Sequence, residues 1–194
     1  MILYFDTETT GLKPGNICQL SYLMQDKLKT IAKNFFFTVD RVEYGAYLLH
    51  GFSVEKLKTL SGGKVFLDHI NDIEKDFLSA DLIVAHNLEF DYKFMCKEFL
   101  LANRQFNVKN GFCSMKSTTD VCKLKRASGS GYKYPKLSEL CAFYKVSEVE
   151  IKLDTKRLFD ETSNFHDARF DTTALYLAIN MGFDTDLAYL KEYL

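Results

Sequence analysis

The order of the apolar segments constrains the fold more than any other feature of this chain. Three segments of strand length come first, at residues 2–6, 17–25 and 31–39, and a polar link at 25–30 suits a hairpin between the last two. Further along, helical periodicity alternates with short apolar segments. Neighbouring strands joined by short turns pair antiparallel, whereas strands joined through helices pair in parallel. The sequence therefore predicts an α/β fold with a mixed sheet of five strands.

Periodicity and breakers indicate the remaining elements. Phe66, Ile70, Ile73 and Phe77 recur at spacings of four, three and four, which gives a helix one apolar face. The connection before that helix contains residues typical of breaks and caps: Gly51, Ser53 and the Gly62-Gly63 pair. We predict short strands at 81–85 and 112–115, helices at 89–102, 117–124, 135–144 and 167–180, a loop at 127–134 and a short amphipathic segment at 184–194.

Composition places the chain among ordinary globular proteins. It has 194 residues, of which 47% are hydrophobic and 26% charged, and no linker divides it, so we expect one domain over residues 1–194. Its longest apolar runs are far shorter than the ~20 residues of a membrane span, and no signal peptide is visible. We therefore expect a cytoplasmic protein without membrane contact.

The cysteine content and the net charge exclude further classes of protein. The five cysteines are odd in number and lack C-x-x-C spacing, which favours free buried thiols over disulfides or a zinc site. The net charge of −1 argues against a broad basic face for long duplex DNA. Any nucleic acid is expected to be held locally, at a short end.

Four acidic residues stand where the local pattern asks for apolar ones. Asp6 and Glu8 end the first strand and, two residues apart, point to the same face. Asp91 and Asp171 continue the apolar stripes of their helices. Each alone could turn into solvent at the end of its stripe, but four together suggest a shared site. Burying ionised carboxylates is costly unless they are paired or bind metal.

Oxygen ligands of this kind select hard divalent ions, so we expect two Mg²⁺ (or Mn²⁺) ions rather than zinc. Two such ions ~3.5–4 Å apart form the usual clamp for in-line attack on a phosphodiester. A base with a pKa near neutrality would complete this machinery, and histidine suits that role.

The motifs resemble those of the DEDDh family of 3′-to-5′ exonucleases, which includes the epsilon proofreading subunit of bacterial DNA polymerase III, ribonuclease T and oligoribonuclease. The segment from Phe5 to Leu12 (FDTETTGL) is similar to the first motif, and AHNLEFD, ending at Asp91, to the second. HDARFD, from His166 to Asp171, fits the His-x-Ala-x-x-Asp pattern of the third. The resemblance covers about residues 1–181.

The resemblance implies a ribonuclease H-like fold and two-metal hydrolysis of DNA or RNA from the 3′ end. It assigns Asp6, Glu8, Asp91 and Asp171 as metal ligands and His166 as general base. Without the resemblance, a histidine before a helix would be interpreted as a cap or a surface group. His86 is expected to be structural or to support the site residues from behind, and His69 carries no functional signal.

Four further residues are candidates for substrate contact. In the family, the turn after the first motif meets the terminal nucleotide, so Thr9 is expected to contact it and Leu12 either to wedge beside the base or to pack in the core. Phe90 either lines the nucleotide pocket or belongs to the core. Asn87 is predicted to cap the helix that carries Asp91.

A basic stretch lies between residues 123 and 136, with five Lys or Arg residues, no acidic ones, and Tyr132 and Tyr134 interleaved. Basic and aromatic groups on a loop suit a single strand through phosphate contact and base stacking. The alternative interpretation is a solvated loop.

Three functions are compared. An active exonuclease, free-standing or serving a polymerase, is the first. A proofreading subunit whose main partner is protein is the second, although the short segment at 184–194 offers no obvious tether. A catalytically dead binding module is the third, and the presence of all four acids and His166 argues against it. DNA, RNA ends and short oligoribonucleotides all stay open as substrates, and some relatives form homodimers.

Overall fold

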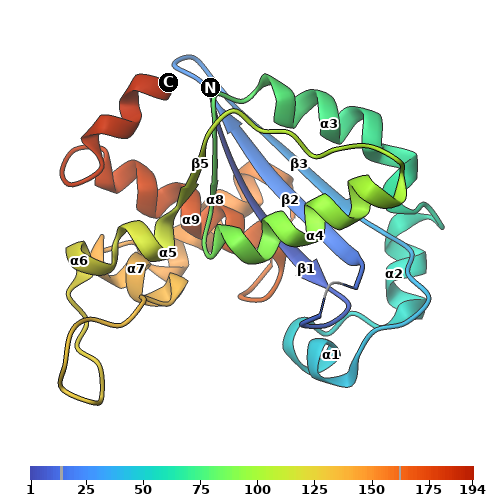
Figure 1. Ribbon diagram of the computed structural model, residues 1–194, viewed down its shortest axis with the longest axis horizontal. Helices are drawn as coiled ribbons and strands as arrows, with labels where there is room; N and C mark the ends of the chain where they lie inside the picture. Colours follow the sequence, from blue (N-terminus) through green and yellow to red (C-terminus); the bar gives the residue numbers. More distant parts are fainter. Residues whose placement is uncertain (14, 162) are drawn as a thin grey trace.

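The computed structural model describes residues 1–13, 15–161 and 163–194 (Figure 1). Within these residues five strands form one sheet in the order β3-β2-β1-β4-β5. The pairs among β1 (Ile2–Thr9), β2 (Ile17–Gln25) and β3 (Thr30–Phe36) are antiparallel, and β4 (Leu82–Ala85) and β5 (Gly111–Cys113) extend the sheet in parallel. The predicted α/β fold with a mixed five-stranded sheet is confirmed, and it is consistent with a ribonuclease H-like fold.

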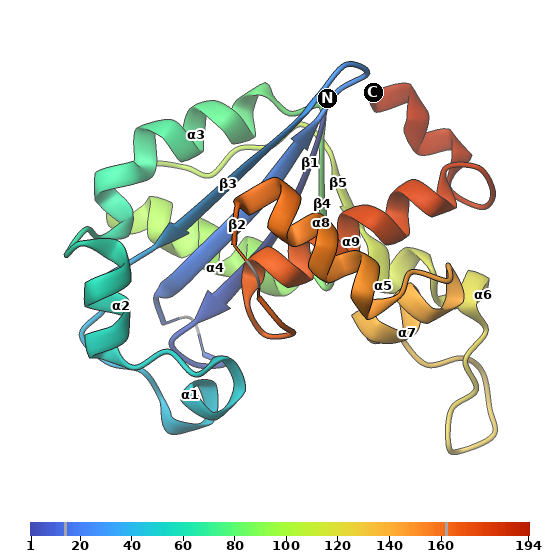
Figure 2. The same cartoon turned by 180° about the vertical axis from the view of Figure 1, so that it is seen from behind.

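Helices cover both faces of the sheet (Figures 1 and 2). One face carries α3 (Ile70–Ser79) and α4 (Leu88–Leu101), and the other carries α7 (Leu137–Phe143), α8 (Glu148–Phe159) and α9 (Ala168–Gly182). Shorter helices complete the structure: α1 (Tyr44–His50), α2 (Val54–Ser61), α5 (Ser114–Ser117), α6 (Thr119–Cys122) and the 3₁₀ helices η1 (Phe66–His69) and η2 (Ala188–Tyr193).

Alternation along β1 separates the core into two layers. Ile2 and Tyr4 pack in the layer beneath α7 and α9, and Leu3 and Phe5 pack in the layer beneath α3 and α4. Successive side chains of a strand point to opposite faces. Asp6 therefore follows Tyr4 toward α9, and Glu8 follows Asp6.

The strand β1 extends past the end of its neighbour β4. Their last pair is Tyr4 with Val84, whereas pairing with β2 continues to Thr9, with an irregularity after Glu8. On the β4 side, no strand of the described chain pairs with β1 beyond Tyr4. The chain turns from β4 into α4 at this point, so the acidic end of β1 borders an open edge rather than a continuous sheet.

Several predicted boundaries change. β1 runs to Thr9 rather than ending at Asp6, and β3 ends at Phe36 rather than at residue 39. The helix predicted at 117–124 is shorter, because α6 covers only Thr119–Cys122. The strand predicted at 112–115 is wrong in its second half: β5 ends at Cys113, and α5 begins at Ser114. The predicted amphipathic end forms η2, where Leu187 and Leu190 pack into the core.

Three helices are absent from the sequence-based prediction: α1, α2 and α8. The start of α8 carries a capping box, in which Ser147 and Glu150 bond each other's backbone amides, and this signal is readable in the sequence. Periodicity fails for α8 because only Ile151 and Thr155 are buried along its length, so the helix has no wide apolar stripe.

Two other expectations concern cysteines and membranes. The five cysteines are free thiols, as predicted, and Cys18, Cys122 and Cys141 are buried. Across the described residues, no helix combines the length and the apolar character needed to cross a bilayer.

Phe77 on α3 anchors one core layer through edge-to-face contacts with Phe5, Tyr22 and Phe106 at 5.2–5.5 Å between ring centroids. We expect Phe77→Ala to lower the free energy of unfolding by about 3–5 kcal/mol, because the surrounding rings cannot close the cavity. The neighbouring Leu78 is 50% exposed, so Leu78→Ala should cost about 0.5 kcal/mol or less. Urea denaturation followed by circular dichroism measures both, and equal losses would contradict this account of the core.

Candidate active site

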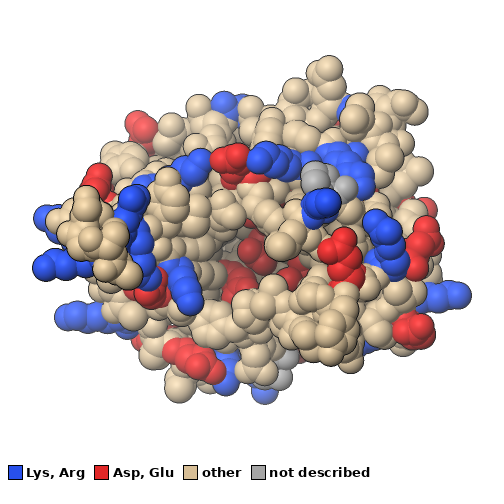
Figure 3. All heavy atoms as spheres, turned by 60° about the horizontal axis from the view of Figure 1, so that its bottom comes forward, with Lys and Arg blue, Asp and Glu red and all other residues tan. Residues whose placement is uncertain are grey.

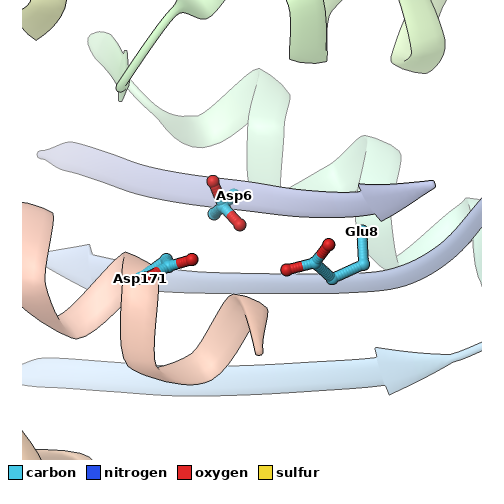
Figure 4. A group of neighbouring side chains, drawn as sticks. All are labelled: Asp6, Glu8 and Asp171. Carbon is cyan, nitrogen blue, oxygen red and sulfur yellow. The ribbon is translucent and has the colours of Figure 1, made fainter. Parts of the chain in front are cut away.

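Three of the predicted acids meet between β1 and α9. Asp6 and Glu8 come from β1 and Asp171 from the first turn of α9, and one carboxylate oxygen of each lies within 4.8 Å of the others (Figure 4). Glu8 is buried, and Asp6 and Asp171 are half-buried. Figure 4 shows the three carboxylates pointing toward one another across the space between strand and helix.

Asp91 approaches from the opposite layer. It lies in the first turn of α4 and is 3% exposed. Its Oδ1 accepts hydrogen bonds from the Thr7 hydroxyl at 2.7 Å and the Thr7 amide at 3.2 Å. Thr7 points to the face opposite to Asp6 and Glu8, so Asp91 sits beside the group of three rather than within it. All four acids line one cavity.

Gln19 on β2 fixes the start of α9. Its register partner on β1 is Glu8. The Gln19 side chain is fully buried, its Oε1 accepts the Ala168 amide at 3.1 Å, and its Nε2 donates to Asp167 Oδ1 at 3.0 Å. These bonds hold the first turn of α9 against the sheet, which sets where Asp171 faces the carboxylates of β1.

Arg169 stabilises the loop that carries His166. Its Nε and Nη2 donate to the Asp167 carboxylate at 2.9 and 2.7 Å, and its Nη1 pairs with Glu161. His166 adopts a left-handed conformation with φ of 65°, and its amide donates to Asp171 Oδ2 at 3.1 Å. Histidine enters this region more readily than most residues. The exposed imidazole lines the same cavity as the acids.

Burial shifts the four carboxylic acids toward the protonated form, and repulsion from the other acids adds to this shift for Asp6 and Glu8. Burial, followed by the charges of Asp91, Asp171 and Glu8, raises the pKa of Asp6. Burial and then Asp171 raise the pKa of Glu8. Burial raises the pKa of Asp91 to about 7 against the opposing bonds from Thr7, and that of Asp171 to about 7.

The basic residues next to these acids in the sequence are engaged elsewhere. Lys93 pairs with Glu89 at 2.8 Å, and Arg169 is taken up by Asp167 and Glu161. Asp171 Oδ1 is buried without a hydrogen-bond partner among the described residues. An orphaned buried oxygen beside three further carboxylates fits hard divalent cations such as Mg²⁺ or Mn²⁺.

The cavity has a volume of about 370 Å³ and includes three of the four residues predicted for substrate contact. Thr9 donates through its hydroxyl to the Gly11 carbonyl at 3.0 Å, which closes the turn after β1. Leu12 is 85% exposed at the rim, so its interpretation as a core residue is wrong. Phe90 is half-buried, lines the cavity and contacts Phe94.

Asn87 does not cap α4 through its side chain, so that prediction is wrong. The residue stands before the helix, but its φ of 74° is left-handed and its side chain makes no capping hydrogen bond. A capping side chain needs an extended backbone to reach the free amides of the first turn. Asn87 instead borders two neighbouring cavities.

Helix α1 forms a wall of the cavity that the sequence did not reveal. Gly45, Ala46 and Leu49 line it. The helix is held by His50, whose Nε2 lies 3.2 Å from the Thr9 carbonyl and whose Nδ1 accepts the Phe52 amide at 3.0 Å. The one sequence signal near this wall was the Gly51 break, which marks the end of α1.

His86 has the structural role predicted for it. Its Nδ1 lies 2.9 Å from the Ser114 hydroxyl and its Nε2 3.0 Å from the Pro135 carbonyl. Burial lowers its pKa to about 4, so the ring stays neutral. His86 thus ties the end of β4 to the segments that begin α5 and α7.

Comparison with known proteins identifies relatives of this chain. No family model matches the chain. It is 32% identical over 151 residues to DNA polymerase III subunit epsilon of Rickettsia conorii, covering 74% of this chain and 62% of that protein. It is 28% identical over 203 aligned positions to the epsilon subunit of Escherichia coli K12, covering 98% of this chain and 75% of that protein. These relatives support an epsilon-like family for this chain.

A further epsilon subunit shows a similar degree of identity. The subunit of Buchnera aphidicola is 27% identical over 157 residues, covering 75% of this chain. The chain spans 62% of the length of the Rickettsia and Buchnera relatives.

The raised acid pKa values predict how stability depends on pH. A carboxyl that titrates near 7 when folded and near 3.8 when unfolded binds its proton more tightly in the folded state. The free energy of unfolding of the metal-free protein should therefore fall as pH rises from about 4 to about 7. Asp91→Asn should flatten this slope, and the exposed Glu192→Gln should leave it unchanged. Urea denaturation in EDTA across that pH range measures the slope. A rising slope in the wild type would contradict the assignment.

The bonds from Gln19 to Asp167 and to the Ala168 amide, called the Gln19 clamp here, predict that removing the Gln19 amide weakens metal binding. Gln19→Leu keeps the volume but removes the bonds to Asp167 and the Ala168 amide, so α9 should shift relative to Glu8 and Mn²⁺ should bind more weakly. Gln25→Leu is the matched control, because Gln25 joins the far end of β2 to Asn180 of α9 at 2.7 Å. It should lower stability without changing Mn²⁺ affinity. Equal effects of the two variants on calorimetric Mn²⁺ binding would remove the positioning role.

Proposed function

We propose that this chain is a metal-dependent 3′-to-5′ exonuclease of the DEDDh type that releases nucleoside 5′-monophosphates from DNA. The observation that carries the proposal is the grouping of Asp6, Glu8 and Asp171 within 4.8 Å, with an orphaned buried oxygen on Asp171 and the exposed His166 on the same cavity. Among the described residues no basic side chain neutralises the group, so cations are its natural partners.

Asp6, Glu8, Asp91 and Asp171 are the residues that would hold two Mg²⁺ (or Mn²⁺) ions. When bound, such ions polarise the phosphodiester, activate water and stabilise the leaving oxygen. His166 would accept a proton from the attacking water on a ring nitrogen, while the water oxygen bonds to phosphorus and the 3′ oxygen of the shortened strand departs. The Asp171 carboxylate accepts the His166 amide and so fixes the backbone from which the imidazole reaches the cavity.

The first cavity would hold the terminal nucleoside. Leu12 and Leu49 are exposed apolar side chains that line this cavity from two different segments, and Phe90 and Ala46 add further apolar surface. A flat base fits between such walls, because stacking and apolar contact bind any base without reading its sequence. Thr9 borders the same space and offers the polar contact expected from the first motif.

DNA is proposed as the polymer because the relatives carry the name of a DNA polymerase subunit. The same name supports a polymerase as the protein partner. RNA 3′ ends or short oligoribonucleotides are the alternative substrates, and a catalytically weak binding subunit is the alternative role. A single domain over residues 1–194 and a cytoplasmic location belong to this proposal, and homodimerisation stays a prediction.

The direct test is to incubate the protein with 5′-labelled single-stranded DNA and RNA in Mg²⁺, Mn²⁺ or EDTA. We expect a ladder that shortens from the 3′ end, only with metal, and faster on DNA. His166→Ala should lower kcat by about 10²–10⁴-fold, the usual contribution of a general base. Asp6→Asn should abolish metal-dependent cleavage.

Matched controls separate chemistry from folding. Asp184→Asn and His69→Ala change the same residue types away from the cavity and should retain activity. Faster shortening of RNA would favour the ribonuclease alternative. Absence of a ladder on either polymer, with metal bound, would leave the binding-subunit role.

A further inference from the structure

A second cavity adjoins the carboxylates. It has a volume of about 770 Å³ and lies among the start of α7, Met115 of α5 and the loop before α9. His86, His166 and Asp171 line both this cavity and the first one. His86 and the catalytic candidates His166 and Asp171 therefore form a partition between two spaces. The substrate contacts expected from the family motifs account for only the first space.

The walls of the second cavity suit a flat unpaired base. Tyr134 is 55% exposed, and the half-buried Phe165 also lines the cavity, with its ring centroid 4.6 Å from that of Phe170. Met115 adds a flexible apolar surface. An aromatic face and an apolar face of this kind form a stacking platform for a nucleobase.

The position of this platform is fixed rather than incidental. The carbonyl of Pro135, next to Tyr134, lies 3.0 Å from His86 Nε2, and His86 follows β4 directly. Lys133 on the other side is paired with Glu139 of α7. The aromatic segment is therefore anchored at both ends to the elements that surround the acids.

Positive charge continues beyond the second cavity. Lys136 lines it, and Lys123, Lys125 and Arg126 are exposed on the adjoining hairpin, which is closed by the bridge between Lys125 and Tyr132. Figure 3 shows acidic groups at the floor of a hollow, with Lys and Arg side chains at its left end and others along its upper and right rim. Such an arrangement favours phosphates that run from the acids toward the hairpin.

We infer that the second cavity binds the base of the nucleotide on the 5′ side of the scissile phosphodiester, and that Lys136 and the basic hairpin follow the phosphates upstream. This inference rests on the proposed exonuclease function. A phosphodiester at the partition places one nucleoside in each cavity. The substrate is then a strand whose last two nucleotides are unpaired, so a duplex end must fray before cleavage.

The test combines an abasic substrate with a variant of the platform. Two 5′-labelled single strands of equal length are compared, one with an abasic site at the penultimate nucleotide. For the wild type, the abasic strand should lose kcat/KM on the order of tenfold, the size of one base stack. Tyr134→Ala should cause a similar loss on the intact strand and no further loss on the abasic strand. Tyr189→Ala, an equally exposed tyrosine on η2, should change neither.

Two results would overturn the inference: equal kcat/KM of the wild type on both strands, or losses from the abasic site and from Tyr134→Ala that multiply. Calorimetric binding in Ca²⁺ separates this failure from failure of the exonuclease proposal. Tyr134→Ala should weaken a dinucleotide on the order of tenfold and leave a nucleoside 5′-monophosphate unchanged, whether or not the protein cleaves. Equal dinucleotide affinity in wild type and variant would remove the subsite.

The hairpin is tested by strand length. Lys125→Glu with Arg126→Glu should raise KM on long single strands and leave the dinucleotide affinity unchanged, because a dinucleotide does not reach the hairpin. A charge reversal with the same effect at every length would contradict the upstream path.

Discussion

The gathering of four carboxylates at one cavity is the constraint around which the rest of the structure is arranged. Folding brings these acids together although burial raises the pKa of each of them and neighbouring charges raise those of Asp6, Glu8 and Asp171 further. Such a cluster is maintained only when the surrounding packing imposes it. Here β1 is paired along its whole length with β2, and Gln19 on β2 holds the first turn of α9. The framework thus maintains an unfavourable charge distribution that divalent cations would relieve.

The open edge of β1 gives the site its access. Because β4 stops pairing at Val84, α4 can carry Asp91 from one layer of the core to the acids of the other. Thr7 receives Asp91 on its own face of the strand, while Asp6 and Glu8 face α9. Both residues that precede the acid-bearing helices, Asn87 and His166, are left-handed, so the chain turns sharply just before each of these helices begins.

Two cavities meet at this cluster, and they are built from different parts of the chain. Helix α1 supplies the outer wall of the first, tied to the end of β1 by His50. The segment before α7 supplies the wall of the second, tied to the end of β4 by His86. In each case a histidine whose pKa is lowered by burial joins a wall to the end of a strand, so the two walls keep a fixed relation to the same acids.

The mixed sheet and the positions of the four acids could be predicted from the sequence alone, because they depend on local patterns: strand alternation, helical periodicity and charges that interrupt both. The role expected of His166 rested on the family resemblance, because a histidine before a helix carries no such local signal. The separation of Asp91 from the other acids could not, because it depends on the end of β4 and on the bond to Thr7. Helix α1, the Gln19 clamp and the place of Tyr134 beside the acids were likewise decided by tertiary contacts between segments far apart in the chain. Polar contacts of this kind leave no periodic trace in a sequence.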